Sequence, residues 1–150
     1  MENRRLYSRA VRLLSRRGYS EEELREKLEP FASAGEVDEV LQECKRSNYL
    51  NDARLAELIA EKQLEKGKGY FFITSTLEKK GIPGDVIESI GKNFDFDREY
   101  AIAKDFFLKN RRSRKLASLL FSLRNRGFSF KTINKLMSTY VKRTEWTAEG

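Results

Sequence analysis

Apolar residues recur at the spacing of α-helices along almost the whole of this chain. Near the N-terminus, Leu6, Ala10, Leu13 and Leu14 fall on one helix face at positions i, i+4, i+7 and i+8, while arginines occupy the other faces. The only stretch that resembles a strand is YFFIT (70–74), and the residues after it return to a helical spacing. The pattern therefore predicts an all-α fold.

Cap signals divide this pattern into separate helices. Ser20 and Glu23 match a capping box, in which each side chain accepts a hydrogen bond from the backbone amide of the other residue. Pro30 and the following ASAG predict a helix break, and Asn51 with Asp52 predicts the cap of a later helix. Between the break and that cap, four apolar residues trace a further helix: Val37, Val40, Leu41 and Cys44.

Pairs of apolar residues at i and i+4 reveal a repeat. The pairs Leu24–Leu28, Ile73–Leu77 and Leu119–Leu123 are separated by intervals of 49 and then 46 residues. After the second and third pairs, Gly81-Ile82 and Gly127-Phe128 occupy matching positions, and each glycine predicts a left-handed helix end. The chain is therefore predicted to be an elongated, curved array of three tandem three-helix units.

The unit boundaries are predicted from the caps between these copies. Ser47-Asn48 and Asn93 precede new helix caps. We expect three-helix units at residues 1–48, 49–95 and 96–143. Residues 144–150, which include Trp146, are expected to form a frayed C-terminal tail.

Composition argues against an enzyme. The 150-residue sequence contains no histidine, the commonest general acid–base catalyst and metal ligand, and a single cysteine. A lone cysteine provides neither a zinc site nor a Cys–His pair. No apolar run approaches the roughly 20 residues that span a bilayer, and no signal-peptide core is present. We expect a cytoplasmic, non-enzymatic protein that uses no metal, cofactor, membrane or small-molecule substrate.

The net charge of +7 is unevenly distributed along the chain. Residues 1–20 carry six arginines and one glutamate. Residues 21–97 carry 11 basic and 18 acidic residues, and residues 98–150 carry 13 basic and four acidic residues. Basic ends and an acidic middle suit a protein whose ends touch a polyanion or a mixed-charge partner.

The turn KGKG (66–69) raises the question of a phosphate-binding loop. A P-loop requires GxxxxGK followed by Ser or Thr, and a dinucleotide-binding loop requires GxGxxG after a strand, so KGKGYFFIT fits neither. We interpret the turn as a helix–helix connector whose glycines permit positive φ. Lys66 and Lys68 are candidates for minor contacts with a partner.

Segment 109–126 is the stronger candidate for binding. A favourable interaction with the dipole at a helix C-terminus explains some of its basic residues. It does not explain the four basic residues within 111–115, which have no acidic neighbour. Aromatic residues are not interleaved with the arginines as a base-stacking platform requires, which predicts phosphate contacts without sequence readout. The candidates are Lys109, Arg111, Arg112, Arg114, Lys115, Arg124 and Arg126, with a second set of Arg9, Arg12, Arg16 and Arg17.

Three motifs in order resemble the bacterial RecX family across residues 8–140. They are RRGYSEEELREKL (16–28), NYLNDARLAE (48–57) and KGKGYFFITSTLEKKGI (66–82). This chain departs from the family pattern where Asn48 stands for Gly, Asn51 for Asp, Leu55 for Phe and Tyr70 for Pro. It also has Glu61 and Gln63 where the family often has arginines, so a binding role is not transferred to those two positions.

The resemblance implies a regulator of the RecA recombinase. Such proteins are curved arrays of three-helix units that lie in the groove of the RecA–DNA filament, where they inhibit strand exchange and ATP hydrolysis or promote disassembly. The implied partners are the RecA filament and DNA. The alternative, supported by the basic ends alone, is a sequence-independent nucleic-acid-binding helical module unrelated to RecA.

Overall fold

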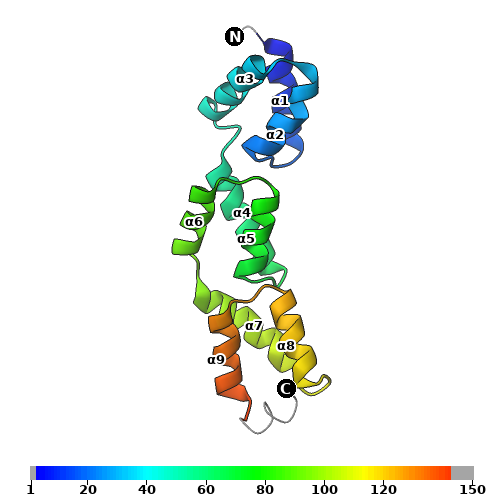
Figure 1. The fold of residues 1–150 in the computed structure, drawn as a ribbon, viewed down its shortest axis with the longest axis vertical. Helices are drawn as coiled ribbons and strands as arrows, with labels where there is room; N and C mark the ends of the chain where they lie inside the picture. Colours follow the sequence, from blue (N-terminus) through cyan, green and yellow to red (C-terminus); the bar gives the residue numbers. More distant parts are fainter. Residues whose placement is uncertain (1–2, 143–150) are drawn as a thin grey trace. The chain divides into compact units, whose positions relative to one another are not determined.

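The computed structural model describes residues 3–142, and all the regular structure among them is helical. The helices are α1 (Arg4–Arg16), α2 (Glu21–Leu28), the 3-10 helix η1 (Glu29–Phe31), α3 (Ala34–Arg46), α4 (Asp52–Glu65), α5 (Tyr70–Lys79), α6 (Gly84–Lys92), α7 (Phe96–Asn110), α8 (Leu116–Asn125) and α9 (Phe130–Tyr140) (Figure 1). The predicted all-α fold is confirmed. None of these helices is long and apolar enough to cross a membrane. The tail with Trp146 lies outside the described residues.

The chain divides into two compact units. Unit 1 comprises Met1–Leu58 and Thr76–Ile90, and unit 2 comprises Ile59–Ser75 and Gly91–Gly150. Helices α4, α5 and α6 therefore each contribute residues to both units. The boundaries expected near residues 48 and 95 fall between α3 and α4 and between α6 and α7, and the division into three three-helix units stays a prediction.

In unit 1, α1 and α2 both pack against α3. Cys44 is fully buried in this core, and burial raises the pKa of its thiol to about 11, so it acts as a small apolar side chain. The buried residues of the core are Leu6, Ala10, Leu24, Leu28, Val37, Val40, Leu41, Cys44 and Leu50.

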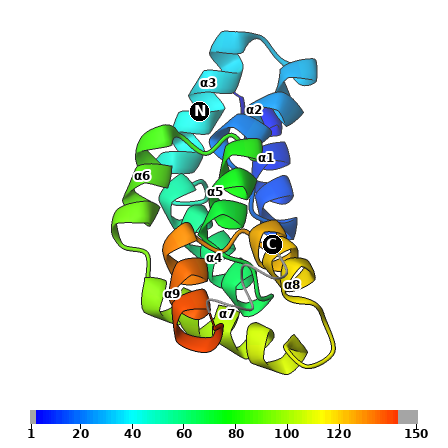
Figure 2. The ribbon, with the colours of Figure 1, turned by 60° about the horizontal axis from the view of Figure 1, so that its bottom comes forward.

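In unit 2, α7 lies against both α8 and α9 (Figure 2). Phe107 of α7 is completely buried, as are Leu119 and Leu123 of α8, the third of the predicted pairs. The remaining buried members of this core are Ala103, Leu116, Phe128, Ile133, Leu136 and Met137.

Capping boxes begin two helices of unit 1. The predicted box at Ser20 and Glu23 is present, with both hydrogen bonds at 3.0 Å. A second box, which was not predicted, joins Ser33 to Glu36 at the start of α3. The break expected over ASAG is therefore shorter than predicted, because the Ser33 hydroxyl caps α3 and lets Ala34 become its first helical residue.

Four of the helices within residues 3–142 end in a left-handed residue, and one of these, Gly67 after α4, is described with the connector below. Gly81 (φ +74°) and Gly127 (φ +81°) adopt the predicted conformation after α5 and α8. Asn48 (φ +59°) ends α3 in the same way, and the amide of Tyr49 donates to the Cys44 carbonyl at 2.9 Å to close the turn. Asparagine substitutes for glycine here because it tolerates this region better than most side chains do.

Unit 1 contains a set of contacts at the start of α2. The Ser20 hydroxyl donates a hydrogen bond to the Lys80 carbonyl in the turn after α5. The first amide of α2, that of Glu21, donates to the Asp52 carboxylate of α4 at 2.9 Å. The start of one helix is thus held by two segments that are distant in sequence.

Unit 2 repeats this arrangement at the start of α5. The Gly69 amide donates to the Arg126 carbonyl after α8 at 2.8 Å, and the Tyr70 amide donates to Glu99 of α7 at 2.8 Å. Ser20 corresponds to Gly69, Lys80 to Arg126 and Asp52 to Glu99. These residues are 49, 46 and 47 positions apart, which matches the spacing of the apolar pairs. The sequence repeat is therefore also a repeat of tertiary contacts.

The carboxylate of Asp52 makes stability depend on pH. Burial raises its pKa and outweighs the hydrogen bond from the Glu21 amide, which lowers it. A carboxyl whose pKa is raised by folding stabilises the fold fully below its unfolded pKa, and this stabilisation is lost as pH rises through the folded pKa. Between pH 3 and pH 7, Asp52→Asn is therefore expected to gain stability relative to the unchanged chain, by less than about 1 kcal/mol because the site is half-exposed.

Urea unfolding at a series of pH values measures this difference. The comparison is between the two proteins at each pH, so that titration of the other carboxyls cancels. A difference that stays constant, or that increasingly favours the unchanged chain as pH rises, would contradict the expected trend.

Candidate nucleic-acid interface

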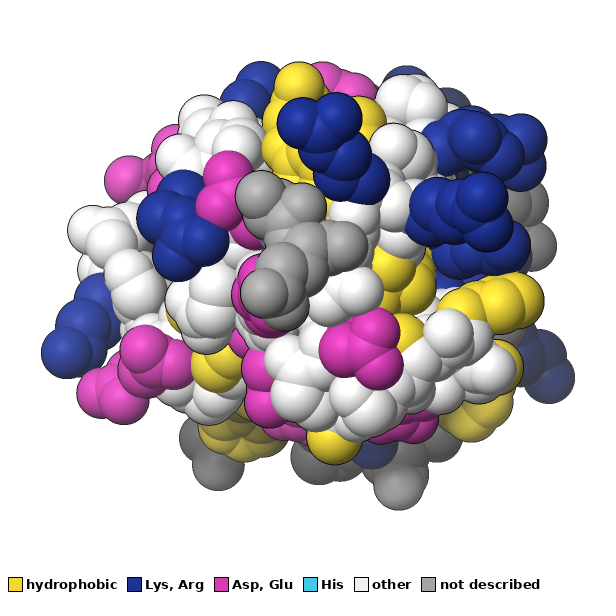
Figure 3. Space-filling model, turned by 90° about the horizontal axis from the view of Figure 1, so that it is seen from above, with side chains coloured by type: hydrophobic (Ala, Val, Ile, Leu, Met, Phe, Trp, Pro, Cys, Tyr) yellow, Lys and Arg dark blue, Asp and Glu magenta, His cyan; other side chains and the backbone are white. Residues whose placement is uncertain are grey.

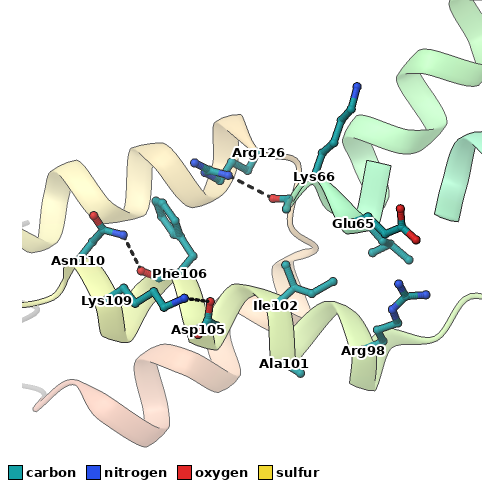
Figure 4. A pocket seen from close by; sticks show the side chains of 12 residues that line it. Glu65, Lys66, Arg98, Ala101, Ile102, Asp105, Phe106, Lys109, Asn110 and Arg126 are labelled. Atoms are coloured by element: carbon teal, nitrogen blue, oxygen red, sulfur yellow. Dashed lines mark hydrogen bonds and ion pairs between the residues drawn. The ribbon is translucent and has the colours of Figure 1, made fainter. Parts of the chain in front are cut away.

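Unit 2 contains a groove of about 580 Å³ that brings together three of the candidate basic residues (Figure 4). Lys66 comes from the connector after α4, Lys109 from α7, and Arg126 from the residue that follows α8. We call this the basic groove. Its apolar lining is formed by Leu64, Ala101, Ile102 and Phe106.

Two cations of the basic groove are already paired with carboxylates. Lys109 Nζ lies 3.0 Å from Asp105 Oδ2, one turn earlier on α7. Arg98, which was not a predicted site residue, forms a bidentate pair with Glu61 at 2.5 and 2.8 Å, and this hydrogen bonding lowers the pKa of Glu61. Glu61, to which no binding role was transferred from the family resemblance, is therefore the partner of Arg98.

Arg126 is half-buried and held in place by its neighbours. Its guanidinium carbon lies 4.2 Å from the centre of the Phe106 ring, and Nη1 donates to the Gly67 carbonyl at 3.4 Å. Gly67 has φ +81°, as the connector interpretation of KGKG requires. The connector is therefore a wall of the groove, and Lys68 lies with its amine 4.9 Å from the Phe72 ring centre.

A stripe of polar residues runs along α8 towards the basic groove. Arg114 Nη2 donates to the hydroxyls of Ser118 at 2.8 Å and Ser122 at 2.5 Å. Arg114 precedes α8, and its side chain reaches Ser118 and Ser122, which lie one turn apart on the helix, whereas Arg126 directly follows α8. We call Arg114, Ser118, Ser122 and Arg126 the α8 stripe.

The remaining candidates lie in or beside the loop between α7 and α8. Arg111 is half-buried, with its guanidinium carbon 5.8 Å from the centre of the Phe107 ring. Arg112 and Lys115 are exposed in the loop, and Arg124 is exposed on the last turn of α8. Residues 106–142 contain ten lysines and arginines and no acidic residue. This segment therefore provides a positive field that attracts polyanions.

Unit 1 carries a separate basic surface on α1. A groove of about 340 Å³ is lined by Arg4, Arg5, Ser8, Arg9 and Arg12. In Figure 3, Lys and Arg side chains gather at the upper right of the face that is drawn. Helical spacing on α1 is the signal that would have added Arg4 and Arg5 to the predicted set.

Only part of the predicted N-terminal set belongs to this surface. Arg9 and Arg12 line the groove, and the Arg9 guanidinium carbon lies 3.8 Å from the centre of the Phe31 ring. Arg17 lies elsewhere, stacked 3.8 Å from the Tyr19 ring centre and 3.5 Å from a Glu23 oxygen. Arg16 is exposed in the last turn of α1 and does not line the groove.

Comparisons of sequence agree on one family. The family model described as "RecX, first three-helix domain" matches residues 7–44. A protein named "Regulatory protein RecX" from Haemophilus influenzae (strain PittEE) is 37% identical over 101 residues, which cover 66% of this chain and 66% of that protein. One of the same name from Acinetobacter baylyi is 34% identical over 135 residues, which cover 87% of this chain and 85% of that protein.

Solved structures show the same fold. The crystal structure of RecX from Lactobacillus salivarius matches with a TM-score of 0.81 and 22% identity, over 89% of this chain and 93% of that one. A second crystal structure, of a regulatory protein RecX, matches with a TM-score of 0.77 and 23% identity over 89% and 72% of the two chains. Because the Acinetobacter relative matches most of both sequences at 34% identity, this chain belongs to the RecX family.

Proposed function

We propose that this chain regulates the RecA recombinase by binding in the groove of the RecA–DNA filament and inhibiting strand exchange. The observation that carries the proposal is membership of a family whose matched relatives are named regulatory proteins. In this proposal the chain acts in the cytoplasm, changes ATP hydrolysis and filament stability, and catalyses no reaction of its own.

The basic groove and the α8 stripe support a DNA contact within that function. Guanidinium groups form forked hydrogen bonds with phosphate, and Arg114 and Arg126 are held in defined positions before any ligand binds. Hydrogen bonds from Arg114 and Arg126 to phosphates would not involve the edges of bases. The surface is therefore proposed to bind phosphates without reading the base sequence.

A strand-exchange assay with RecA tests the function directly. We expect the purified chain to inhibit strand exchange and RecA-dependent ATP hydrolysis, and to hydrolyse no nucleotide when RecA is omitted. Binding to bare DNA is measured beside binding to RecA-coated DNA over a range of salt concentrations. Equal or tighter binding to bare DNA would instead favour the sequence-independent nucleic-acid-binding module, for which the acid-free segment 106–142 is the supporting observation.

Removing two exposed arginines is expected to weaken binding without unfolding the chain. Arg112→Ala combined with Arg124→Ala removes two positive charges beside the α8 stripe. The slope of log K against log salt should fall by about 0.7–0.9 for each phosphate contact that is lost. The matched control is Lys62→Ala with Lys131→Ala, which removes the same charge from exposed positions on α4 and α9. Equal effects of the two double variants would exclude a defined site on α8.

A further inference from the structure

Phe121 projects from the outer face of α8. Its side chain is 68% exposed, whereas Leu119 and Leu123, two residues away on either side, are completely buried. Two residues correspond to about 200° around a helix, so the surface that buries the leucines directs Phe121 outwards. One exposed apolar side chain is ordinary in proteins, and the interest of this ring therefore depends on its surroundings.

Those surroundings are cationic and open. Arg124 is exposed one turn after Phe121, and Ser118 lies one turn before it. The Arg114 guanidinium is bound to Ser118, one turn before Phe121, and to Ser122, the residue next to Phe121, whereas Arg124 lies one turn after Phe121. Ala117, also one turn earlier, is too small to cover the ring. Phe121 is thus an aromatic side chain between two arginines on a helix face without any carboxylate.

Other exposed aromatic rings of the described chain differ from Phe121. The Phe31 ring is covered by the Arg9 guanidinium, and the Phe71 ring contacts Tyr70 edge to face at 5.5 Å. Phe130 is 71% exposed, but its helix, α9, carries no arginine. Within residues 3–142, Phe121 is the exposed phenylalanine that has an arginine on its own helix and whose ring contacts neither another ring nor a cation.

We propose that Phe121 stacks on an unpaired base of a single-stranded nucleic acid whose phosphates are bound by Arg114 and Arg124. Base–aromatic stacking is tolerant of sequence, because every base presents a π-face, and it needs a base that is free of its duplex stack. The bonds from Arg114 to the two serines all use Nη2, so Nε and Nη1 remain available for a phosphate. This inference rests on the DNA contact proposed above and specifies its ligand as the unpaired strand.

The proposal revises the expectation that no aromatic platform accompanies these arginines. In the sequence, Phe121 stands within LLFSL and looks like a core residue. The structure separates it from the leucines, because only the side of α8 that faces α7 is buried.

Three ligands labelled with the same fluorophore test the stacking. They are an oligothymidylate of about 15 nucleotides, an abasic oligomer of the same length, and a duplex, each titrated by fluorescence anisotropy at several salt concentrations. Phe121→Leu is expected to bind the oligothymidylate roughly tenfold more weakly than the unchanged chain does. Binding to the abasic oligomer and to the duplex should not change, and the salt slope should be the same, because no charge is removed.

Two further variants serve as controls. Phe121→Trp retains an aromatic ring and should retain the affinity for oligothymidylate, whereas Phe130→Leu removes an equally exposed ring elsewhere in unit 2 and should have no effect. Urea unfolding should confirm that Phe121→Leu is as stable as the unchanged chain, because the ring is exposed.

Each other outcome overturns the proposal. It fails if the unchanged chain does not bind bare oligothymidylate, if Phe121→Leu binds it normally, or if the loss is equal on the abasic oligomer. A loss confined to RecA-coated DNA would instead identify Phe121 as a protein contact. Strand-exchange inhibition by the unchanged chain is measured separately, so failure of the RecA function is distinguishable from failure of the stacking site.

Discussion

Replacing Glu99 by alanine is expected to lower the free energy of unfolding by about 4 kcal/mol. Glu99 is completely buried, and its Oε1 accepts the backbone amides of Tyr70 at 2.8 Å and Ser129 at 3.1 Å. Its Oε2 accepts the hydroxyls of Ser129 at 2.6 Å and Thr132 at 2.5 Å. Alanine would remove the acceptor of four donors, three of them on the buried residues Ser129 and Thr132 and the fourth the part-buried Tyr70 amide, and each unsatisfied buried group costs roughly 1–3 kcal/mol.

The position of this carboxylate explains how it tolerates burial. It lies at the N-terminus of both α5 and α9, where unpaired amides and the helix dipoles favour a negative charge. Loss of Glu99 therefore also removes the acceptor of the first amide of α5 and of the amide of Ser129, the N-cap residue of α9.

Urea unfolding of the full chain, followed by circular dichroism, measures the effect. Glu99→Gln keeps the size and one acceptor oxygen, so an intermediate loss is expected. Glu57→Ala, at an exposed position of α4, is the matched control and should change stability by less than about 0.5 kcal/mol. A loss of less than about 1 kcal/mol for Glu99→Ala would mean that the four donors find other partners.

Gly127→Ala is the second substitution with a large expected effect, a loss of about 3 kcal/mol. Gly127 has φ +81°, a conformation that costs a residue with a Cβ about 1–2 kcal/mol. An added Cβ would also lie 2.3 Å from the Phe72 amide nitrogen and 2.6 Å from Phe72 Cβ. The clash involves backbone, and relieving it would strain the hydrogen bond from the Phe71 amide to the Gly127 carbonyl, now 2.9 Å.

Two other glycines make this experiment a graded series. Gly67 shares the φ of Gly127, but a Cβ there would meet only the movable end of Arg126 at 3.2 Å, so Gly67→Ala should cost about 1 kcal/mol. Gly35 lies within α3 with nothing inside 4 Å, so alanine should stabilise the chain by about 0.5–1 kcal/mol. In thermal or urea unfolding, we expect the variant stability to decrease in the order Gly35→Ala, Gly67→Ala, Gly127→Ala. Equal losses at Gly67 and Gly127 would show that φ alone decides.

The helices could be predicted because their signals are local. Capping at Ser20 and the left-handed ends at Gly81 and Gly127 depend on residues within about five positions of one another, so the sequence alone reveals them. The capping box at Ser33 is equally local, but it was not predicted because Pro30 and the following ASAG were interpreted as a helix break. The 49- and 46-residue intervals of the apolar pairs recur between the contacts at the starts of α2 and α5, and the three-helix repeat that they indicate stays a prediction.

The candidate site could be predicted only as a set of charges. Lys66, Lys109 and Arg126 were each candidates, but their meeting in one groove depends on helix packing across 60 residues of sequence. Pairing is equally non-local: nothing near Arg98 in the sequence indicates that it pairs with Glu61.

By itself, the sequence determined the all-α class, the positions of most helix ends and the family, because periodicity, caps and motifs are properties of short segments. The apolar pattern also indicated which side of most helices is covered, and the tertiary structure alone decided the exceptions. Glu99, within the charged run DREY, looks like a solvated first-turn carboxylate and is completely buried, whereas Phe121 looks like core and is exposed. Burial depends on which helices pack against a given face, and that packing is set by residues tens of positions away.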